Sequence, residues 1–224
     1  MKKRALSILL LFTMLLGMAP LSIPNVSAAD VSYPVEGGNI YFDKATGTIT
    51  DADSKITSAN IPSEIDGVAV TEIGFEAFFL CYGLKNITIP GSVTSIGFGA
   101  FSHCYALRSI TIPSSVTVIE NLAFSDCVNL TSVTLSEGLI WIGNHAFQSC
   151  DALTSITIPS SVTTIGEGAF QHCDKLSSVT LSKGLTSIGE FSFYSCDALT
   201  SITIPDSVTS IGRGALASAT ICQA

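Results

Sequence analysis

The sequence predicts a β-rich solenoid, a right-handed stack of short units joined by parallel β-ladders with little regular α-helix. The first observation is a motif, Phe-x-x-Cys-x-x-Leu-x-x-(Ile/Val)-x-(Ile/Leu), that occurs six times at a constant spacing of 23 residues. A fixed period of this length is typical of solenoids, in which each unit buries its apolar face against its neighbours. The second observation is apolar/polar alternation within each copy, which indicates short strands, and the third is a turn containing Pro or Gly after them. The motif places in the core the phenylalanines Phe78, Phe101, Phe124, Phe147, Phe170 and Phe193 and the cysteines Cys81, Cys104, Cys127, Cys150, Cys173 and Cys196.

Residues 1–29 have the composition of a secretory signal peptide. Basic residues at positions 2–4 precede an apolar run at 5–18 and a stretch of small residues at 26–29, where cleavage after Ala28 or Ala29 is expected. The apolar run is shorter than the roughly 20 residues that span a bilayer, so an uncleaved anchor is the less favoured alternative. We therefore expect a secreted or surface-exposed bacterial protein with no stable membrane span after cleavage.

The chain that follows this segment is strongly acidic. It contains seven of the ten Lys and Arg residues and all 18 Asp and Glu residues, which gives a net charge of −11. Such a surface repels a phosphate backbone, so the sequence argues against a nucleic-acid partner.

Residues 30–60 do not repeat and are expected to form an N-terminal cap over the exposed end of the stack. Residues 39–42 and 47–50 are predicted to be strands with a turn between them. Asp43, Asp51 and Asp53 suggest a calcium loop, but the Gly and Glu that such a loop needs at later offsets are missing. We interpret these acids as solvated turn residues, and we expect no metal and no cofactor.

Residues 61–216 contain about six to seven repeat units, and residues 217–224 are expected to form an eroded last unit. The first unit carries extra residues around positions 64–67, which predicts a protruding loop. A glycine follows the second short strand of most units and is expected to allow positive φ at a corner.

In each unit a threonine lies between two apolar residues, so it should face outwards while they enter the core. Stacking would align these threonines in an exposed ladder on a parallel sheet: Thr88, Thr111, Thr134, Thr157, Thr180 and Thr203.

The cysteines and histidines of the repeat suggest chemistry, but their spacing favours a structural role. Equivalent cysteines in adjacent units should lie about 5 Å apart, yet their Cα–Cβ bonds run nearly parallel, which disfavours a disulfide. The sequence has no Cys-x-x-Cys pair to form a metal site. His103 and His172 lie three units apart, and no third group recurs to orient a Cys–His pair. We therefore expect buried free thiols, which suit a reducing habitat, and no enzymatic activity.

Four residues interrupt the polar positions of the repeat. Ile140 and Trp141 stand where other units have mainly Thr or Ser, and Tyr82 and Tyr105 stand where later units have Asp. Exposed Trp and Tyr are frequent anchors of binding interfaces, although single apolar residues are also common on surfaces. These four residues and the threonine ladder are the candidate ligand contacts.

One unit, residues 153–173, reads Leu-x-x-Ile-x-Ile-Pro-x-x-Val-x-x-Ile-Gly-x-x-Ala-Phe-x-x-Cys. It closely resembles the BspA-type, or Treponema-type, bacterial leucine-rich repeat family, and similar units cover about residues 61–216. The resemblance implies a leucine-rich repeat fold and a secreted or surface location, with adhesion to host matrix proteins, other bacteria or epithelial cells. Ser136 and Ser182 depart from the pattern because they replace Pro, and this alternation suggests duplication of a two-unit block.

The sequence therefore favours a non-enzymatic module that binds an extracellular protein or glycan through its repeat β face. The signal peptide, the repeat and the lack of a catalytic motif in the sequence support this hypothesis. The alternative is a structural or accessory repeat module, or a truncated remnant of a larger surface protein, with no specific ligand.

Overall fold

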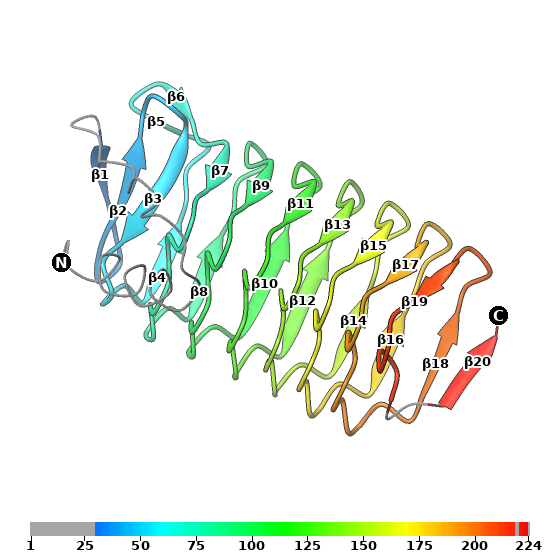
Figure 1. Cartoon of the computed structure of the whole chain (residues 1–224). Coiled ribbons are helices and arrows are strands. Elements are labelled where there is room, and N and C mark those ends of the chain that lie inside the picture. Colours follow the sequence, from blue (N-terminus) through cyan, green and yellow to red (C-terminus); the bar gives the residue numbers. More distant parts are fainter. Residues whose placement is uncertain (1–29, 218–219, 224) are drawn as a thin grey trace, which may run out of the picture.

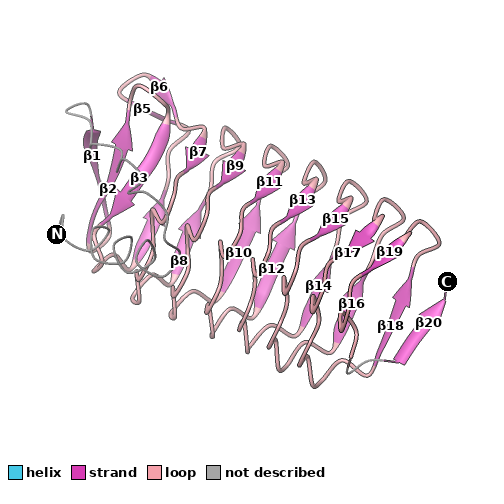
Figure 2. Cartoon of the chain, viewed as in Figure 1, coloured by secondary structure: helices cyan, strands magenta, loops and turns pink. Residues whose placement is uncertain are grey.

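The computed structural model describes residues 30–217 and 220–223. These residues form an elongated stack of rungs, each rung being one 23-residue unit, in which strands alternate with loops (Figure 1). Figure 2 shows no helix among them, so the described part of the chain contains no helix that could cross a membrane. The predicted β-solenoid is confirmed, whereas the predicted signal peptide lies outside the described residues.

An antiparallel meander forms the cap, with strands β1 (Asp30–Val35), β2 (Gly38–Asp43) and β3 (Thr48–Ala52). The strands and turn predicted in this region are confirmed. Asp53 accepts hydrogen bonds from the Asn39 N–H (2.9 Å), from Asn39 Nδ2 (3.2 Å) and from the Tyr41 hydroxyl (3.2 Å). This carboxylate therefore ties the end of β3 to β2. Within the described residues, no group of three or more His, Cys, Asp or Glu could hold a metal ion.

One side of the stack is a single ten-stranded sheet that continues from the cap. β3 pairs in parallel with β7 (Glu72–Ile73), with Ile49 opposite Ile73, so the cap covers an edge of the repeat strands that would otherwise be exposed. The inward residue of each later strand is an isoleucine, buried in every rung except at Ile211. These strands are β7 (Glu72–Ile73), β9 (Ser95–Ile96), β11 (Val118–Ile119), β13 (Trp141–Ile142), β15 (Thr164–Ile165), β17 (Ser187–Ile188) and β19 (Ser210–Ile211).

A second row of strands, the threonine row, pairs only two strands at a time. The pairs are β4 (Ser58–Asn60) with β8 (Asn86–Thr88), β10 (Ser109–Ile112) with β12 (Ser132–Leu135), β14 (Ser155–Thr157) with β16 (Ser178–Thr180), and β18 (Ser201–Ile204) with β20 (Thr220–Gln223). Thr111 lies opposite Thr134, and Thr157 lies opposite Thr180, but β12 and β14 belong to different sheets. The prediction of one continuous threonine ladder is therefore wrong, because the ladder is interrupted after every second rung.

The pairing follows the two-unit alternation of the sequence. In two alternate units a glycine, Gly138 or Gly184, occupies the turn after the strand of the threonine row. A Cβ on Gly138 would collide with the Ser114 carbonyl, and one on Gly184 would collide with the Ser160 carbonyl. Glycine therefore lets this turn lie close against the preceding rung. Two of the four strand pairs of the threonine row, β10 with β12 and β14 with β16, join these closely approaching rungs, whereas β4–β8 and β18–β20 pair without such a glycine.

The extra residues of the first unit form a protruding hairpin, as predicted. Its strands are β5 (Glu64–Ile65) and β6 (Val68–Ala69). Asp66 and Gly67 make the tip, with φ of 51° and 76°. Lys44 Nζ in the cap lies 3.5 Å from Asp66 Oδ2, so an exposed ion pair connects the cap to the hairpin.

The third side of the stack has no strands, yet backbone hydrogen bonds join its rungs. The Phe101 N–H donates to the Ala123 carbonyl of the next rung at 2.7 Å, and the equivalent bond recurs at every motif phenylalanine. The buried phenylalanine rings stack along the core, with centroids 5.0–5.3 Å apart and planes within 12° of parallel. One large apolar residue per rung therefore fills the core continuously.

The prediction of positive φ at the glycines after the second strand is wrong. Gly97, Gly143, Gly166, Gly189 and Gly212 all lie outside the left-handed region. Glycine is needed there because the preceding rung is close: a Cβ on Gly143, for example, would lie 2.6 Å from backbone atoms of that rung. Positive φ occurs instead at two later positions of each rung, which several residues with side chains occupy.

Candidate functional site

The six motif cysteines are buried, and none of them forms a disulfide. Cys127 Sγ donates to the Phe101 carbonyl of the preceding rung at 3.2 Å, and equivalent bonds of 3.1–3.4 Å recur along the stack. Burial raises the pKa of the Cys127 thiol to about 12 and raises the pKa of Cys104, Cys150 and Cys173 well above the usual range. A protonated, enclosed thiol is a poor nucleophile, so free cysteines do not require a reducing habitat. The side chain of Cys222 lies outside the described structure.

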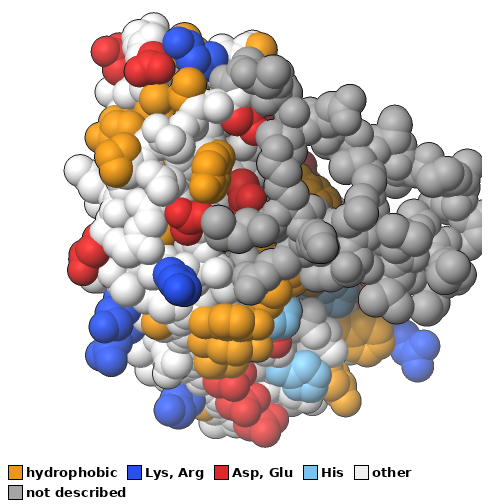
Figure 3. Space-filling model, turned by 90° about the vertical axis from the view of Figure 1, so that its left-hand side faces the viewer, with side chains coloured by type: hydrophobic (Ala, Val, Ile, Leu, Met, Phe, Trp, Pro, Cys, Tyr) orange, Lys and Arg blue, Asp and Glu red, His pale blue; other side chains and the backbone are white. Residues whose placement is uncertain are grey.

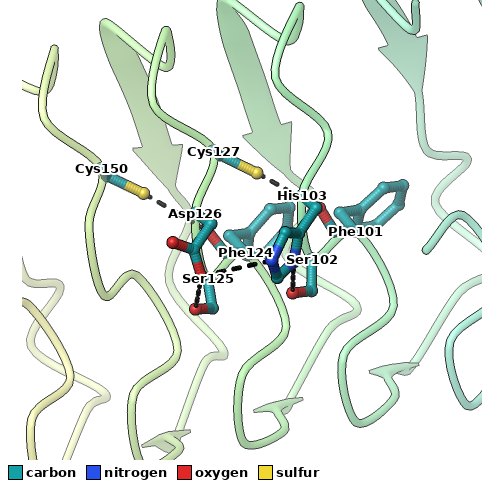
Figure 4. Close-up of polar contacts among 8 residues, drawn as sticks. All are labelled: Phe101, Ser102, His103, Phe124, Ser125, Asp126, Cys127 and Cys150. Atoms are coloured by element: carbon teal, nitrogen blue, oxygen red, sulfur yellow. Dashed lines mark hydrogen bonds and ion pairs between the residues drawn. The ribbon is translucent and has the colours of Figure 1, made fainter. Parts of the chain in front are cut away.

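Figure 4 shows a Ser-His-Asp cluster that the sequence pattern did not reveal. Ser102 Oγ lies 2.8 Å from His103 Nδ1, and His103 Nε2 lies 3.9 Å from Asp126 Oδ2. The Ser125 hydroxyl donates to the same carboxylate oxygen at 2.7 Å. Because Ser102 is only 5% exposed, its hydroxyl cannot approach a substrate as the nucleophile of a catalytic triad does. The cluster therefore orients His103 rather than activating a nucleophile.

The threonines of the threonine row have exposed side chains in all six rungs predicted, Thr88, Thr111, Thr134, Thr157, Thr180 and Thr203. Because the strands pair two at a time, shallow grooves lie between the pairs. A groove of about 200 Å³ lies between β12 and β14, lined by Thr134 and Thr157 among others, and one of about 230 Å³ lies between β8 and β10. Both grooves are open to solvent, so they suit contact with a macromolecule better than enclosure of a small one.

The ten-stranded sheet carries a second column of threonines on its outer surface, and Ile140 interrupts it. In this column each threonine hydroxyl bonds at 2.9–3.4 Å to the carbonyl one rung earlier, as in Thr94, Thr117, Thr163, Thr186 and Thr209. Ile140 is 49% exposed. Trp141 is half-buried rather than exposed, and it lies opposite Val118. Val118, Ile140 and Trp141 together form what we call the Trp141 patch.

The structure places the Trp141 patch and the threonine row on different faces. Both rows send apolar side chains into the same core, for example Ile110 from β10 and Ile119 from β11. Since side chains alternate along a strand, the outward residues of the two rows point away from each other. The sequence hypothesis combined them in one contact surface, but a flat partner can contact only one of them.

Tyr82 and Tyr105 lie at a corner, in the turn that leads into the threonine row. Their rings stack with centroids 5.0 Å apart and planes 30° apart. His103 packs against the Tyr105 ring at 5.7 Å and meets the edge of Phe79 at 5.6 Å. We call these four residues the tyrosine corner. The sequence pattern indicated the two tyrosines and suggested His103 only as a partner of a cysteine, and it did not indicate Phe79. The signal that could have found them is that Phe79 lies three positions before Tyr82 and His103 lies two positions before Tyr105.

The repeat that builds these surfaces also matches a known family. Residues 51–151 and 140–223 match the BspA type leucine-rich repeat region, in six copies. The chain belongs to the BspA-type leucine-rich repeat family. The repeat family and the fold are typically non-enzymatic. No curated protein matches the chain.

Several solved bacterial leucine-rich repeat proteins are similar to this BspA-type protein. A leucine-rich cell surface protein from Faecalibacterium prausnitzii is 32% identical, with a TM-score of 0.71 over 86% of this chain and 54% of that one. The leucine-rich repeat protein of T. pallidum is 31% identical, with a TM-score of 0.74 over 83% and 88% of the two chains. A protein from Eubacterium ventriosum is 30% identical, with a TM-score of 0.75 over 84% and 50%. The chain therefore spans about half the length of two of these three proteins.

Proposed function

We propose that this protein is a secreted or cell-surface interaction module that binds an extracellular protein through the Trp141 patch. The proposal rests on the break in the outer threonine column of the ten-stranded sheet. Threonine suits that position because it favours strands and its hydroxyl bonds to the preceding rung. Ile140 provides no such bond and leaves 49% of its surface exposed. An apolar group within a polar surface is what the centre of a protein interface requires.

The family and its relatives support this proposal. Repeat solenoids typically bind through the extended surfaces that their stacked units create. A similar protein is described as a cell surface protein, and the sequence begins with the features of a signal peptide. N-terminal sequencing of the protein recovered from culture medium or cell surface is expected to start at Ala29 or Asp30.

The binding test uses the purified protein and immobilised extracellular matrix proteins or host-cell surface extracts. We expect saturable binding that Ile140→Thr and Trp141→Thr each weaken roughly tenfold or more, which corresponds to about 1.4 kcal/mol. Both variants introduce the residue type found in other rungs, so the fold should be retained. Thr186→Ala, in the same column two rungs away, is the control and should bind like the wild type.

Two results would contradict the proposal. One is the absence of saturable binding to any of these materials. The other is binding that neither substitution changes. The first result favours the alternative of an accessory repeat module without a specific ligand. The second indicates that the contact surface is the threonine row and not the Trp141 patch.

A further inference from the structure

The tyrosine corner presents an exposed aromatic stack on the first two complete rungs. Tyr82 is 49% exposed and Tyr105 is 39% exposed. Among the described residues, Tyr105 is the only aromatic ring in contact with Tyr82. Figure 3, which views the molecule from this end, shows hydrophobic side chains gathered beside histidine side chains. The stack therefore offers a rigid aromatic surface to solvent.

Hydrogen bonds fix the polar groups next to this stack. The nearly buried Ser102 holds His103 Nδ1 at 2.8 Å, and His103 Nε2 faces the Asp126 carboxylate at 3.9 Å. Ser125 holds that carboxylate in turn, at 2.7 Å. The imidazole is therefore oriented between the Phe79 and Tyr105 rings, with its edge and the carboxylate available to hydroxyl groups.

The fold does not explain why these residues are aromatic. Later rungs have Asp151, Asp174 and Asp197 at the position of the tyrosines and keep the same backbone course. The left-handed conformation of His103 recurs at the same position in the other rungs, so it is a property of the repeat rather than of this corner. The aromatic residues are therefore a local departure from the repeat.

We propose that the tyrosine corner binds carbohydrate, with a sugar ring of a polysaccharide packed on the tyrosine stack. The C–H groups of a sugar carry partial positive charge, which favours the negative face of an aromatic ring. Sugar hydroxyls both donate and accept, so they match the tyrosine hydroxyls, His103 and the Asp126 carboxylate. This site lies on a different part of the surface from the Trp141 patch, so it goes beyond the proposed function.

The local charges favour a sugar over a cationic ligand, the other chemistry that aromatic rings attract. Lys85 and Arg108 follow the two tyrosines by three residues each, and both side chains are exposed. Because Lys85 and Arg108 carry positive charge, they oppose the approach of a cation. The Asp126 side chain is 38% exposed, and Ser125 and His103 face only its Oδ2 atom, so the carboxylate can still accept a hydrogen bond from a sugar hydroxyl. The open surface also suits one ring of a long polymer better than an isolated small molecule, which needs enclosure.

Native affinity electrophoresis tests this proposal, with the purified protein run in gels that contain mannan, laminarin, xylan or pectin. We expect at least one polysaccharide to retard the protein, and we expect Tyr82→Ala and Tyr105→Ala to abolish the retardation. Tyr194→Ala is the matched control, because Tyr194 has the same 39% exposure as Tyr105 but lies several rungs away. Trp141→Thr should also leave the retardation unchanged, which separates this site from the protein-binding patch. Thermal unfolding of each variant checks that its fold is retained.

Two outcomes would overturn the proposal. The first is equal mobility with and without every polysaccharide. The second is retardation that survives in Tyr82→Ala or is lost equally in Tyr194→Ala.

Discussion

Each buried cysteine of the motif has two roles in the core. Its sulfur fills volume, and its thiol donates to a backbone carbonyl, of the cap for Cys81 and of the preceding rung for the others, as Cys127 does to Phe101. Only the protonated thiol can act as this donor. Since every rung repeats the arrangement, small contributions at one residue add up along the stack.

We therefore expect the protein to lose stability as the pH rises above about 8.5, where ordinary thiols ionise. The thiols of the unfolded chain release their protons there, whereas burial keeps Cys127 protonated up to about pH 12. The native state then binds more protons, and each such thiol lowers the free energy of unfolding by about 1.4 kcal/mol per pH unit. Urea unfolding between about pH 7.5 and 9.5 measures how steeply the free energy of unfolding falls with pH. Cys127→Val should make this fall less steep by the contribution of one thiol. A stability that stays constant over this range would contradict the expectation.

Glu137 connects two rungs although its side chain is exposed. Its carboxylate accepts hydrogen bonds at 3.0–3.1 Å from the Ser160 N–H and hydroxyl and from the Ser161 N–H. These bonds, with the Ser160 N–H the largest cause, lower the pKa of Glu137. Their stabilisation is therefore complete above the ordinary glutamate pKa of about 4.3 and is lost as the pH falls through the lower folded-state pKa. The melting temperature of Glu137→Gln should lie below that of the wild type at neutral pH, and the two should converge in acid once the pH falls below the lowered folded-state pKa of Glu137. An unchanged difference in acid would show that the charge of Glu137 is unimportant.

At the scale of elements, features encoded within one unit were predictable and features that depend on a neighbouring rung were not. The strands, the outward threonines and the buried phenylalanines follow from the alternation of apolar and polar residues. The two-by-two pairing depends on how closely Gly138 approaches Ser114, which becomes evident only when the backbones are stacked. The tyrosine corner likewise arises because His103 reaches Phe79 of the preceding rung. The two-unit alternation marks the units that carry the glycine but not what the glycine touches, and no periodicity marks the contact between His103 and Phe79.

The close approach at Gly138 can be tested by adding a single methyl group. Gly138→Ala should destabilise the protein by roughly 2–4 kcal/mol, because φ is +112° and the new Cβ meets the Ser114 carbonyl. Gly91→Ala is the matched control: nothing lies within 4 Å of a Cβ there, so its effect should stay within about 0.5 kcal/mol. Equilibrium unfolding in urea compares the two variants. Equal effects would mean that the glycine turn does not set the distance between rungs.

At the scale of the whole molecule, the cap and the solenoid form one continuous sheet. β3 is the last strand of the antiparallel cap and also the first parallel neighbour of the repeat strands. An unprotected sheet edge is prone to fraying and aggregation. The stability of the N-terminal rungs therefore depends on how firmly β3 is attached to β2.

Asp53→Ala should loosen this attachment, because it leaves Asn39 and Tyr41 without their shared acceptor. We expect a loss of about 1–3 kcal/mol. Hydrogen exchange should increase more at β7 and β9 than at β17. Asp66→Ala, which removes only the exposed ion pair with Lys44, is the control and should cost less than about 1 kcal/mol. Uniform exchange along the stack would show that the cap does not protect the first rungs.

The hydrogen bonds between rungs also determine how the protein would respond to mechanical tension. On the ten-stranded sheet and on the side without strands they join each rung to the next, and on the threonine row they join the rungs in pairs, in each case roughly along the long axis of the stack. A pulling force on the two ends therefore opens these bonds one rung at a time, as in a zipper, instead of shearing many of them together. Each released rung of 23 residues adds about 75 Å of extended chain. A stack attached at one end and loaded at the other would lengthen in steps and limit the peak force on its contacts.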